Sequence, residues 1–259
     1  IFESLPVFGG MLSVGIPHYR LPRNIIGAEL YALQQCGVNV RTGVTVGKDL
    51  TLSDLHEQGF AAVFLGIGAY ESQRLGLEGE TETRGVMSGI DYLAQMLSGH
   101  EIALGDRVVV IGGGNVAIDV ARVALRSGWK DVTIVYRRTR EEMPAAPMEV
   151  HHVDQEGVRL IFLAAPTRIL SRDGQLTGVE FVRMDLGEED ESGRRSPQPV
   201  PGSEFILEAD VLVPAVGQKS IPVYDPTVKV EVTPRGTYVV DPVTLQTSVE
   251  WIFAGGDTV

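Results

Sequence analysis

The sequence is poor in three features, and each shortage excludes a class of protein. Its single cysteine, Cys36, excludes an intrachain disulfide, a C-x-x-C redox pair and a four-thiolate iron-sulfur site within this chain. Its apolar runs are far shorter than the roughly 20 residues of a membrane span. Basic residues are few, because 22 Lys and Arg face 34 Asp and Glu, and the formal net charge is −12. We therefore expect a cytoplasmic protein without nucleic acid or membrane among its partners.

Signatures of hydrolases and metal enzymes are also missing. The sequence has no G-x-S-x-G, H-E-x-x-H or P-loop spacing. The neighbouring His151 and His152 are interpreted as surface residues rather than metal ligands. We predict no metal site and no protein nucleophile. The chain has no initiator Met and no leader pattern, so we expect it to be a piece of a longer polypeptide.

Glycine is abundant instead, and its placement predicts an α/β fold. Thirty glycines are present, and several directly follow apolar runs, where a strand gives way to a tight turn. Residues 22–37 carry apolar side chains at helical spacing, and Thr51 with Asp54 resembles the capping pair of a short helix. Residues 60–70 form a continuous apolar run, which predicts a strand that is buried on both faces of a sheet.

A connector is expected in the first third of the chain. Residues 70–86 are rich in Gly and Glu without clear periodicity, which predicts a connector between two units. The second unit is expected to begin with a helix near residue 90 and to continue into the glycine-rich stretch described below.

Short strands are expected in the second half of the chain. After residue 150, apolar stretches of strand length alternate with turns, and residues 237–241 and 250–257 are also strand-like. Residues 188–203 are polar and contain Pro, which predicts a hairpin loop. We interpret its acidic cluster, from Glu188 to Glu191, as a solvated loop tip, with a docking patch as the alternative.

The most informative stretch begins with the apolar strand Val108–Ile111. Gly112, Gly114 and Ala117 follow it with G-x-G-x-x-A spacing. The first glycine permits a tight turn, the second lets the backbone approach a pyrophosphate, and the alanine allows close packing of helix on strand. A helix from about Asn115 would direct its N-terminal N–H groups at the anion. This context favours dinucleotide binding over a purely structural turn.

Arginines follow the next strand, at the position where NAD sites usually place an acid. Arg137 and Arg138 come directly after that strand, and Arg140 follows shortly afterwards. Guanidinium groups bind phosphate in a bidentate manner, so the pair favours a ribose 2′-phosphate over a 2′-hydroxyl. We therefore predict NADPH rather than NADH. The alternative is a solvated basic strand end.

These motifs together resemble those of a known family. The stretches GGMLSVGIPHYRLP, AVFLGIGA, VVVIGGGNVAIDVAR, VYRRTREEMPA and IFAGGD occur in this order across essentially the whole chain. They resemble the flavoprotein reductases in which an NADP domain is inserted into an FAD domain. In particular, they resemble the small (beta) subunits of NADPH-dependent glutamate synthases and related pyridine nucleotide-disulfide-type oxidoreductases. The resemblance implies an α/β fold of two Rossmann-like units, with an NADPH-binding domain in residues 86–217 and the parts of an FAD-binding domain in residues 1–80 and 218–259.

The resemblance implies the cofactors and the residues that bind them. The cofactors are NADPH and, in the full-length protein, FAD. The pyrophosphate of NADPH would lie against Gly112, Gly114, Asn115, Val116 and Ala117, and its 2′-phosphate against Arg137 and Arg138. FAD would contact Glu3 through its adenosine ribose, Gly9, Gly10 and Met11 along the flavin, and Gly256 and Asp257 near the ribitol and pyrophosphate. No catalytic side chain is implied, because the flavin carries the chemistry.

The resemblance also implies a reaction and a partner. Hydride would pass from NADPH to FAD, and electrons would leave through iron-sulfur clusters outside this chain. They would reach the large glutamate synthase subunit or another redox subunit. The FAD-binding G-x-G-x-x-G would lie before residue 1, so we expect this piece to bind NADPH but to hold FAD weakly or not at all. Three alternatives remain: a flavin monooxygenase, a ferredoxin-linked electron-entry subunit, and a nucleotide-binding or subunit-docking module without turnover.

Overall fold

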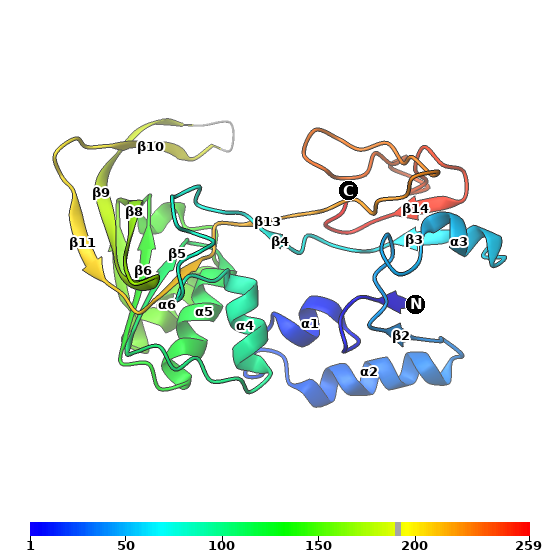
Figure 1. The fold of residues 1–259 in the computed structure, drawn as a ribbon, viewed down its shortest axis with the longest axis horizontal. Coiled ribbons are helices and arrows are strands. Elements are labelled where there is room, and N and C mark those ends of the chain that lie inside the picture. Colours follow the sequence, from blue (N-terminus) through cyan, green and yellow to red (C-terminus); the bar gives the residue numbers. More distant parts are fainter. Residues whose placement is uncertain (190–192) are drawn as a thin grey trace. The chain divides into compact units, whose positions relative to one another are not determined.

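The computed structural model describes residues 1–189 and 193–259 and divides into two compact units (Figure 1). Unit 1 consists of Ile1–Ser13, His18–Glu71 and Gln218–Val259. Unit 2 consists of Val14–Pro17 and Ser72–Gly217. Strands β4 (Glu71–Ser72) and β13 (Gln218–Lys219) pair where the chain passes between the units. The predicted α/β fold, with one unit inserted into the other, is confirmed.

Unit 2 is built on a parallel four-stranded sheet in the order β12-β5-β6-β7. The bounds of these strands are β5 Arg107–Ile111, β6 Asp131–Tyr136, β7 Arg159–Phe162 and β12 Val211–Pro214. Val108 and Val110 of β5 belong to the core under the helices, while Val109 and Ile111 belong to the core on the opposite face. The central strand is therefore buried on both faces, as its unbroken apolar run predicts.

Helices cover one face of this sheet, and a second sheet covers the other. The helices are α4 (Gly89–Leu97), α5 (Asn115–Arg126) and α6 (Pro147–Gln155), with a short 3-10 turn η1 (Arg140–Glu142). The second sheet is antiparallel and consists of β8 (Ala164–Arg172), β9 (Gln175–Glu189), β10 (Arg195–Pro199) and β11 (Phe205–Glu208). Helix α6 is absent from the sequence prediction, although Pro147 at its start and the buried Val150 and Val153 are helix signals.

Two segments of unit 2 differ from the sequence prediction. The polar stretch predicted as a loop is largely a paired arm, because β9 continues through Glu188 and Glu189 and β10 pairs with it. The rest of the acidic cluster lies outside the described residues. The stretch predicted as a connector packs on unit 2, where Leu75 and Leu77 join the core and the Arg84 N–H donates to Gly174 O at 2.8 Å.

Unit 1 contains two separate parallel strand pairs. Strand β1 (Phe2–Glu3) pairs with β2 (Arg41–Thr42), and β3 (Val63–Leu65) pairs with β14 (Ile252–Ala254). Its helices are α1 (Gly10–Val14), which ends at the boundary with unit 2, α2 (Arg23–Gln35) and α3 (Leu52–Glu57). The predicted capping pair at the start of α3 is present.

In unit 1 one strand prediction is confirmed only in part and another is wrong. Strand β3 is only three residues long and is not buried on both faces, because the Phe64 side chain is 62% exposed. Among the described residues β3 pairs only with β14, so one of its two edges has no partner strand. Residues 237–241 form an isolated bridge at Tyr238 rather than a strand, although Tyr238 itself is buried in the core of this unit.

A buried carboxylate joins two distant segments of unit 1. Asp225 is 6% exposed and accepts hydrogen bonds from the backbone N–H groups of Ser53, Thr227 and Val228 at 2.7 to 2.9 Å. Burial by itself would raise the pKa of the Asp225 carboxyl, but these hydrogen bonds together hold it below its ordinary value. The ionised side chain thereby fixes the start of α3 against the loop that follows β13.

Asp225→Asn is expected to lower the free energy of unfolding by about 2 kcal/mol near neutral pH, because an amide nitrogen cannot accept from these buried donors. The folded-state pKa of Asp225 is depressed, so its contribution is present above the unfolded-state pKa of about 3.9 and fades as the pH falls further. Denaturant unfolding should show a difference in the free energy of unfolding between wild type and variant, and this difference should become smaller by about pH 3. Asp241→Asn, in an exposed turn with the same kind of contacts, should have a smaller effect. Equal losses for the two variants would contradict burial as the cause.

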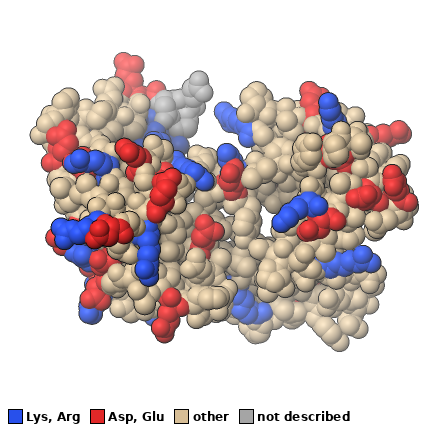
Figure 2. All heavy atoms as spheres, viewed as in Figure 1, with Lys and Arg blue, Asp and Glu red and all other residues tan. Residues whose placement is uncertain are grey.

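The surface carries charges of both signs. Figure 2 shows acidic and basic side chains interspersed over the face in view. No helix among the described residues has the combined length and apolar character that a bilayer span requires. Within the same residues, no three His, Cys, Asp or Glu side chains lie together as a metal ligand set. Cys36 is exposed.

Candidate dinucleotide site

The first two glycines of the turn after β5 are required by packing. Gly112 has a φ of +148°, and a Cβ built there would lie 2.3 Å from Ala215 O, at the end of the neighbouring strand. A Cβ at Gly113 would lie 2.6 Å from the ring of Tyr136, at the end of β6. Sequence reasoning gave Gly113 no role. The consecutive glycines, with an aromatic residue ending the next strand, are the signal it could have used.

The third glycine leaves open space at the start of a helix. Gly114 is the N-cap of the 12-residue α5, and the nearest atom to a Cβ built there is Pro144 Cγ at 3.9 Å. Ala117 is fully buried and packs close to Gly112. Asn115 is exposed and Val116 is half-buried on the first turn. The N-terminus of a helix attracts anions through its unpaired N–H groups and its dipole, so this turn is suited to a phosphate group.

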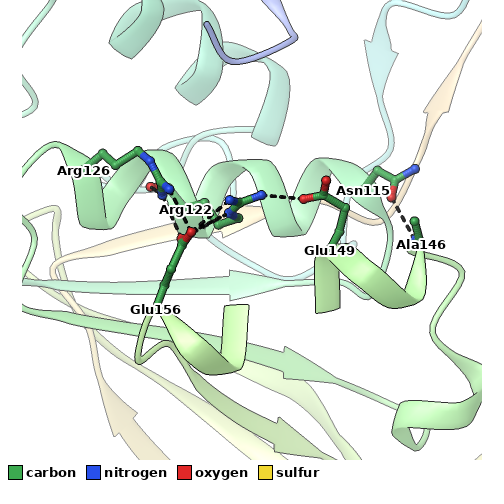
Figure 3. A network of polar contacts seen from close by, with 6 residues as sticks. All are labelled: Asn115, Arg122, Arg126, Ala146, Glu149 and Glu156. Atoms are coloured by element: carbon green, nitrogen blue, oxygen red, sulfur yellow. Dashed lines mark hydrogen bonds and ion pairs between the residues drawn. The ribbon is translucent and has the colours of Figure 1, made fainter. Parts of the chain in front are cut away.

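A loop after β6 is bonded to the glycine turn. The Ala145 N–H donates to Gly113 O at 3.1 Å, and the Ala146 N–H donates to Asn115 Oδ1 at 3.1 Å, as Figure 3 shows for the second contact. The Tyr136 hydroxyl donates to Glu142 O at 2.8 Å. The predicted site residue Asn115 thus uses its side-chain oxygen to hold this loop. Apart from Arg137 and Arg138, the residues of this loop were not among the predicted site residues.

Ion pairs anchor the helix that follows this loop (Figure 3). Arg122 of α5 is 7% exposed and contacts Glu149 at 2.5 Å and Glu156 at 2.9 Å, on α6 and at its end. Arg126 contacts Glu156 at 2.7 Å. The hydrogen bonds from Arg126, followed by those from Arg122, lower the pKa of Glu156 to about 2, although partial burial opposes the shift. These contacts fix α6, and therefore the loop before it, against α5.

The three arginines after β6 have different environments. Arg137 is exposed, whereas Arg138 is 3% exposed and donates from Nε to Arg195 O at 2.7 Å. Arg140 pairs with Asp154 of α6 at 2.6 Å, which raises the pKa of its guanidinium. Arg195 in turn donates from Nε to Glu142 Oε1 at 2.7 Å. The end of β6 therefore carries a cluster of arginines, two of whose members are paired with the carboxylates of Asp154 and Glu142.

The predicted site residues of unit 1 lie in three places. Glu3 ends β1, and its Oε1 accepts from the Leu5 N–H at 2.9 Å. Gly9, Gly10 and Met11 lie at the start of α1, where a Cβ at Gly9 would lie 2.4 Å from Ser13 Oγ. Gly256 and Asp257 are exposed just after β14. The structure brings Glu3 and Asp257 to the ends of parallel strands, but these strands belong to different pairs.

Known proteins resemble the chain over nearly its whole length. It is 48% identical over 100% of its residues to the NADP(+)-dependent formate dehydrogenase subunit beta of Moorella thermoacetica, and it covers 37% of that protein. It is 37% identical, again over 100% of its residues, to the glutamate synthase [NADPH] small chain of Halomonas elongata, of which it covers 57%. The chain therefore spans less than two thirds of the length of these relatives.

The fold has a solved counterpart. Mycobacterium tuberculosis FprA in complex with NADPH aligns with 98% of this chain at a TM-score of 0.78 and 20% identity, and the chain covers 70% of that structure. At this identity the likeness is one of fold. The sequence model of the pyridine nucleotide-disulphide oxidoreductases matches residues 3–259. Since that match takes in both units and every motif discussed above, the chain belongs to the pyridine nucleotide-disulphide oxidoreductase family.

Proposed function

We propose that this chain is the dinucleotide-binding part of an NADPH-dependent flavoprotein oxidoreductase. Unit 2, predicted from sequence as residues 86–217, binds NADPH, and unit 1 contributes to the binding of FAD. The observation that carries this proposal is the pairing of an open glycine at the start of α5 with arginines at the end of β6. The names of the two relatives, one NADP(+)-dependent and one NADPH-dependent, support the choice of coenzyme.

The residues of unit 2 fit NADPH in two ways. The N–H groups of the first turn of α5 suit the pyrophosphate, because the space beside Gly114 is open: a Cβ built there would lie 3.9 Å from Pro144 Cγ. The exposed Arg137 and the buried Arg138 suit the 2′-phosphate, because a guanidinium matches phosphate with two parallel N–H bonds. No carboxylate follows β6 directly, where an NAD site would have one.

The residues of unit 1 are suited to bind part of an FAD molecule. Glu3 presents a carboxylate at a strand end, as the ribose of a dinucleotide requires, and Gly9 has a backbone conformation that favours glycine. Bound flavin supplies the hydride-accepting chemistry, and the protein supplies binding and orientation. Gly9, Gly10 and Met11 would then lie along the flavin, with Gly256 and Asp257 near its ribitol and pyrophosphate.

The proposal includes a partner subunit in the cytoplasm. Both relatives are named as one chain of a larger enzyme, a subunit beta and a small chain. Electrons would pass from the flavin through iron-sulfur clusters outside this chain to a partner of the glutamate synthase or formate dehydrogenase kind. The single Cys36 supports the placing of those clusters elsewhere, because a cluster needs several thiolates.

Arg137→Ala tests the coenzyme assignment. The variant is expected to bind NADPH roughly tenfold to a hundredfold more weakly, which corresponds to the loss of hydrogen bonds between charged groups. Binding of NADH should change little, since it has no 2′-phosphate. Titration of both coenzymes by fluorescence measures this difference. Arg172→Ala, an exposed arginine at the end of β8, is the matched control and should leave both affinities unchanged. Equal weakening of NADPH and NADH by Arg137→Ala would refute the 2′-phosphate role.

A further inference from the structure

The arm formed by β9 and β10 brings a distant arginine to the end of β6. Arg195 is the first residue of β10, and the register of that strand shifts between Arg195 and Pro197. Such a bulge turns a side chain away from the direction that regular pairing would give it. The Arg195 side chain is 50% exposed and reaches Glu142, whose side chain is only 10% exposed.

The same residue holds Arg138. The Nε of Arg138 donates to the Arg195 carbonyl at 2.7 Å, and the Arg138 carbonyl accepts from the Leu163 N–H at 3.2 Å. Leu163 has a φ of +54°, a conformation that is costly for a leucine and that is found at sites where the surrounding structure enforces it. Arg138 is therefore fixed at its backbone by Leu163 and at its side chain by Arg195.

Glu142 places a negative charge near Arg138, and Arg195 compensates that charge. Its Oε2 accepts from the Thr139 N–H at 2.9 Å and from the Thr139 hydroxyl at 2.5 Å. The bond from that hydroxyl is the main reason that the pKa of Glu142 lies below its usual value, so the side chain is ionised. An uncompensated carboxylate four residues from Arg138 would repel a phosphate dianion. The guanidinium of Arg195 offsets that charge at 2.7 Å.

We propose that Arg195 is a specificity-determining residue for a 2′-phosphorylated adenosine ligand. Its carbonyl orients the guanidinium of Arg138, and its side chain neutralises Glu142, so that the strand end accepts a 2′-phosphate. Arg195 is a positioning residue that acts through its two neighbours. This inference rests on the proposed function and adds to it a residue 57 positions away from Arg138 along the chain.

The test uses the full-length protein and two probes, adenosine 2′,5′-bisphosphate and adenosine 5′-monophosphate, with calorimetry as the readout. Arg195→Ala is expected to weaken the bisphosphate roughly tenfold and to leave the monophosphate unchanged. Arg195→Lys should restore part of the loss, because it returns the charge. Arg195→Ala combined with Glu142→Gln should also restore part of it, because the repelling carboxylate is gone.

Three results would overturn the inference. They are an unchanged bisphosphate affinity in Arg195→Ala, equal weakening of both probes, and no recovery in either the lysine or the double variant. If Arg195→Ala does not fold, Arg195→Lys and Arg195→Gln carry the same comparison, since lysine keeps the charge and glutamine removes it. Arg137→Ala, measured with the same two probes, distinguishes a failure of the role of Arg195 from a failure of the proposed function. Selective loss in Arg137→Ala without loss in Arg195→Ala rejects this inference alone, whereas no selectivity in Arg137→Ala rejects the proposed function.

Discussion

Gly112→Ala is expected to destabilise the protein by roughly 3 kcal/mol or more and to abolish coenzyme binding, because two penalties act together. The φ of +148° is unfavourable for alanine, and the added Cβ would lie 2.3 Å from a backbone oxygen, that of Ala215, which cannot rotate away. Relief requires that β5 and β12 move apart at their carboxyl ends. Denaturant unfolding followed by circular dichroism measures the loss. A stability equal to that of wild type would show that the turn adapts without moving the sheet.

Gly114→Ala is the matched variant, two residues further along the same turn. The N-cap conformation of Gly114 is extended and the space around it is open, so the fold should lose about 1 kcal/mol or less, the difference between glycine and alanine as N-caps. The methyl group would occupy the space that the proposed pyrophosphate needs. We expect at least about tenfold weaker binding of NADPH with a nearly unchanged unfolding midpoint. Unchanged affinity would place the phosphate elsewhere.

Arg122→Met is the second variant with a large expected effect, a loss of about 3 kcal/mol in the free energy of unfolding. The guanidinium is 7% exposed and lies against both Glu149 and Glu156. Its removal takes the cation away from two half-buried carboxylates, and such an imbalance costs more than the pair itself contributes. Chemical denaturation at neutral pH measures the loss.

Two comparisons identify the cause of that loss. Lys130→Met removes an ion pair of similar length, 2.8 Å to Asp106, but both side chains are mostly exposed, so little change is expected. Adding Glu149→Gln to Arg122→Met should recover part of the stability, because a half-buried carboxylate that Arg122 contacts is then replaced by a neutral amide, whereas Glu156 keeps its ion pair with Arg126. If the exposed pair proves as costly as the buried one, burial is not the source of the effect.

The central β-strand, turn and helix of unit 2 could be predicted because their signals are local. Val108–Ile111 forms an unbroken apolar run, Gly112 and Gly114 follow at fixed spacing, and the apolar face of α5 recurs with the helical period. The cap of α3 could be predicted for the same reason, since Thr51 and Asp54 are three residues apart. Spacing within one element depends only on the geometry of that element.

The errors concern features that depend on neighbours. The apolar run around Phe64 predicts a strand that is buried on both faces, but such burial requires other elements packed on each face, and the Phe64 side chain is 62% exposed. Residues 188 and 189 read as a loop because they are charged, yet β10 supplies them with a partner strand. Polarity identifies exposed residues, but it does not tell whether their backbone is paired.

The fold class, the glycine turn that suits a phosphate and the arginines that follow β6 could be predicted from the order of residues, because each depends on residues that are close together along the chain. The differences among these arginines are seen only in the folded chain: Arg137 is exposed, Arg138 is buried against the Arg195 carbonyl, and Arg140 pairs with Asp154. These differences arise because hydrogen bonds and burial depend on distance in space. The pairing of β9 with β10 brings Arg195 to Arg138. The register of that pairing cannot be predicted from the spacing of residues in the sequence.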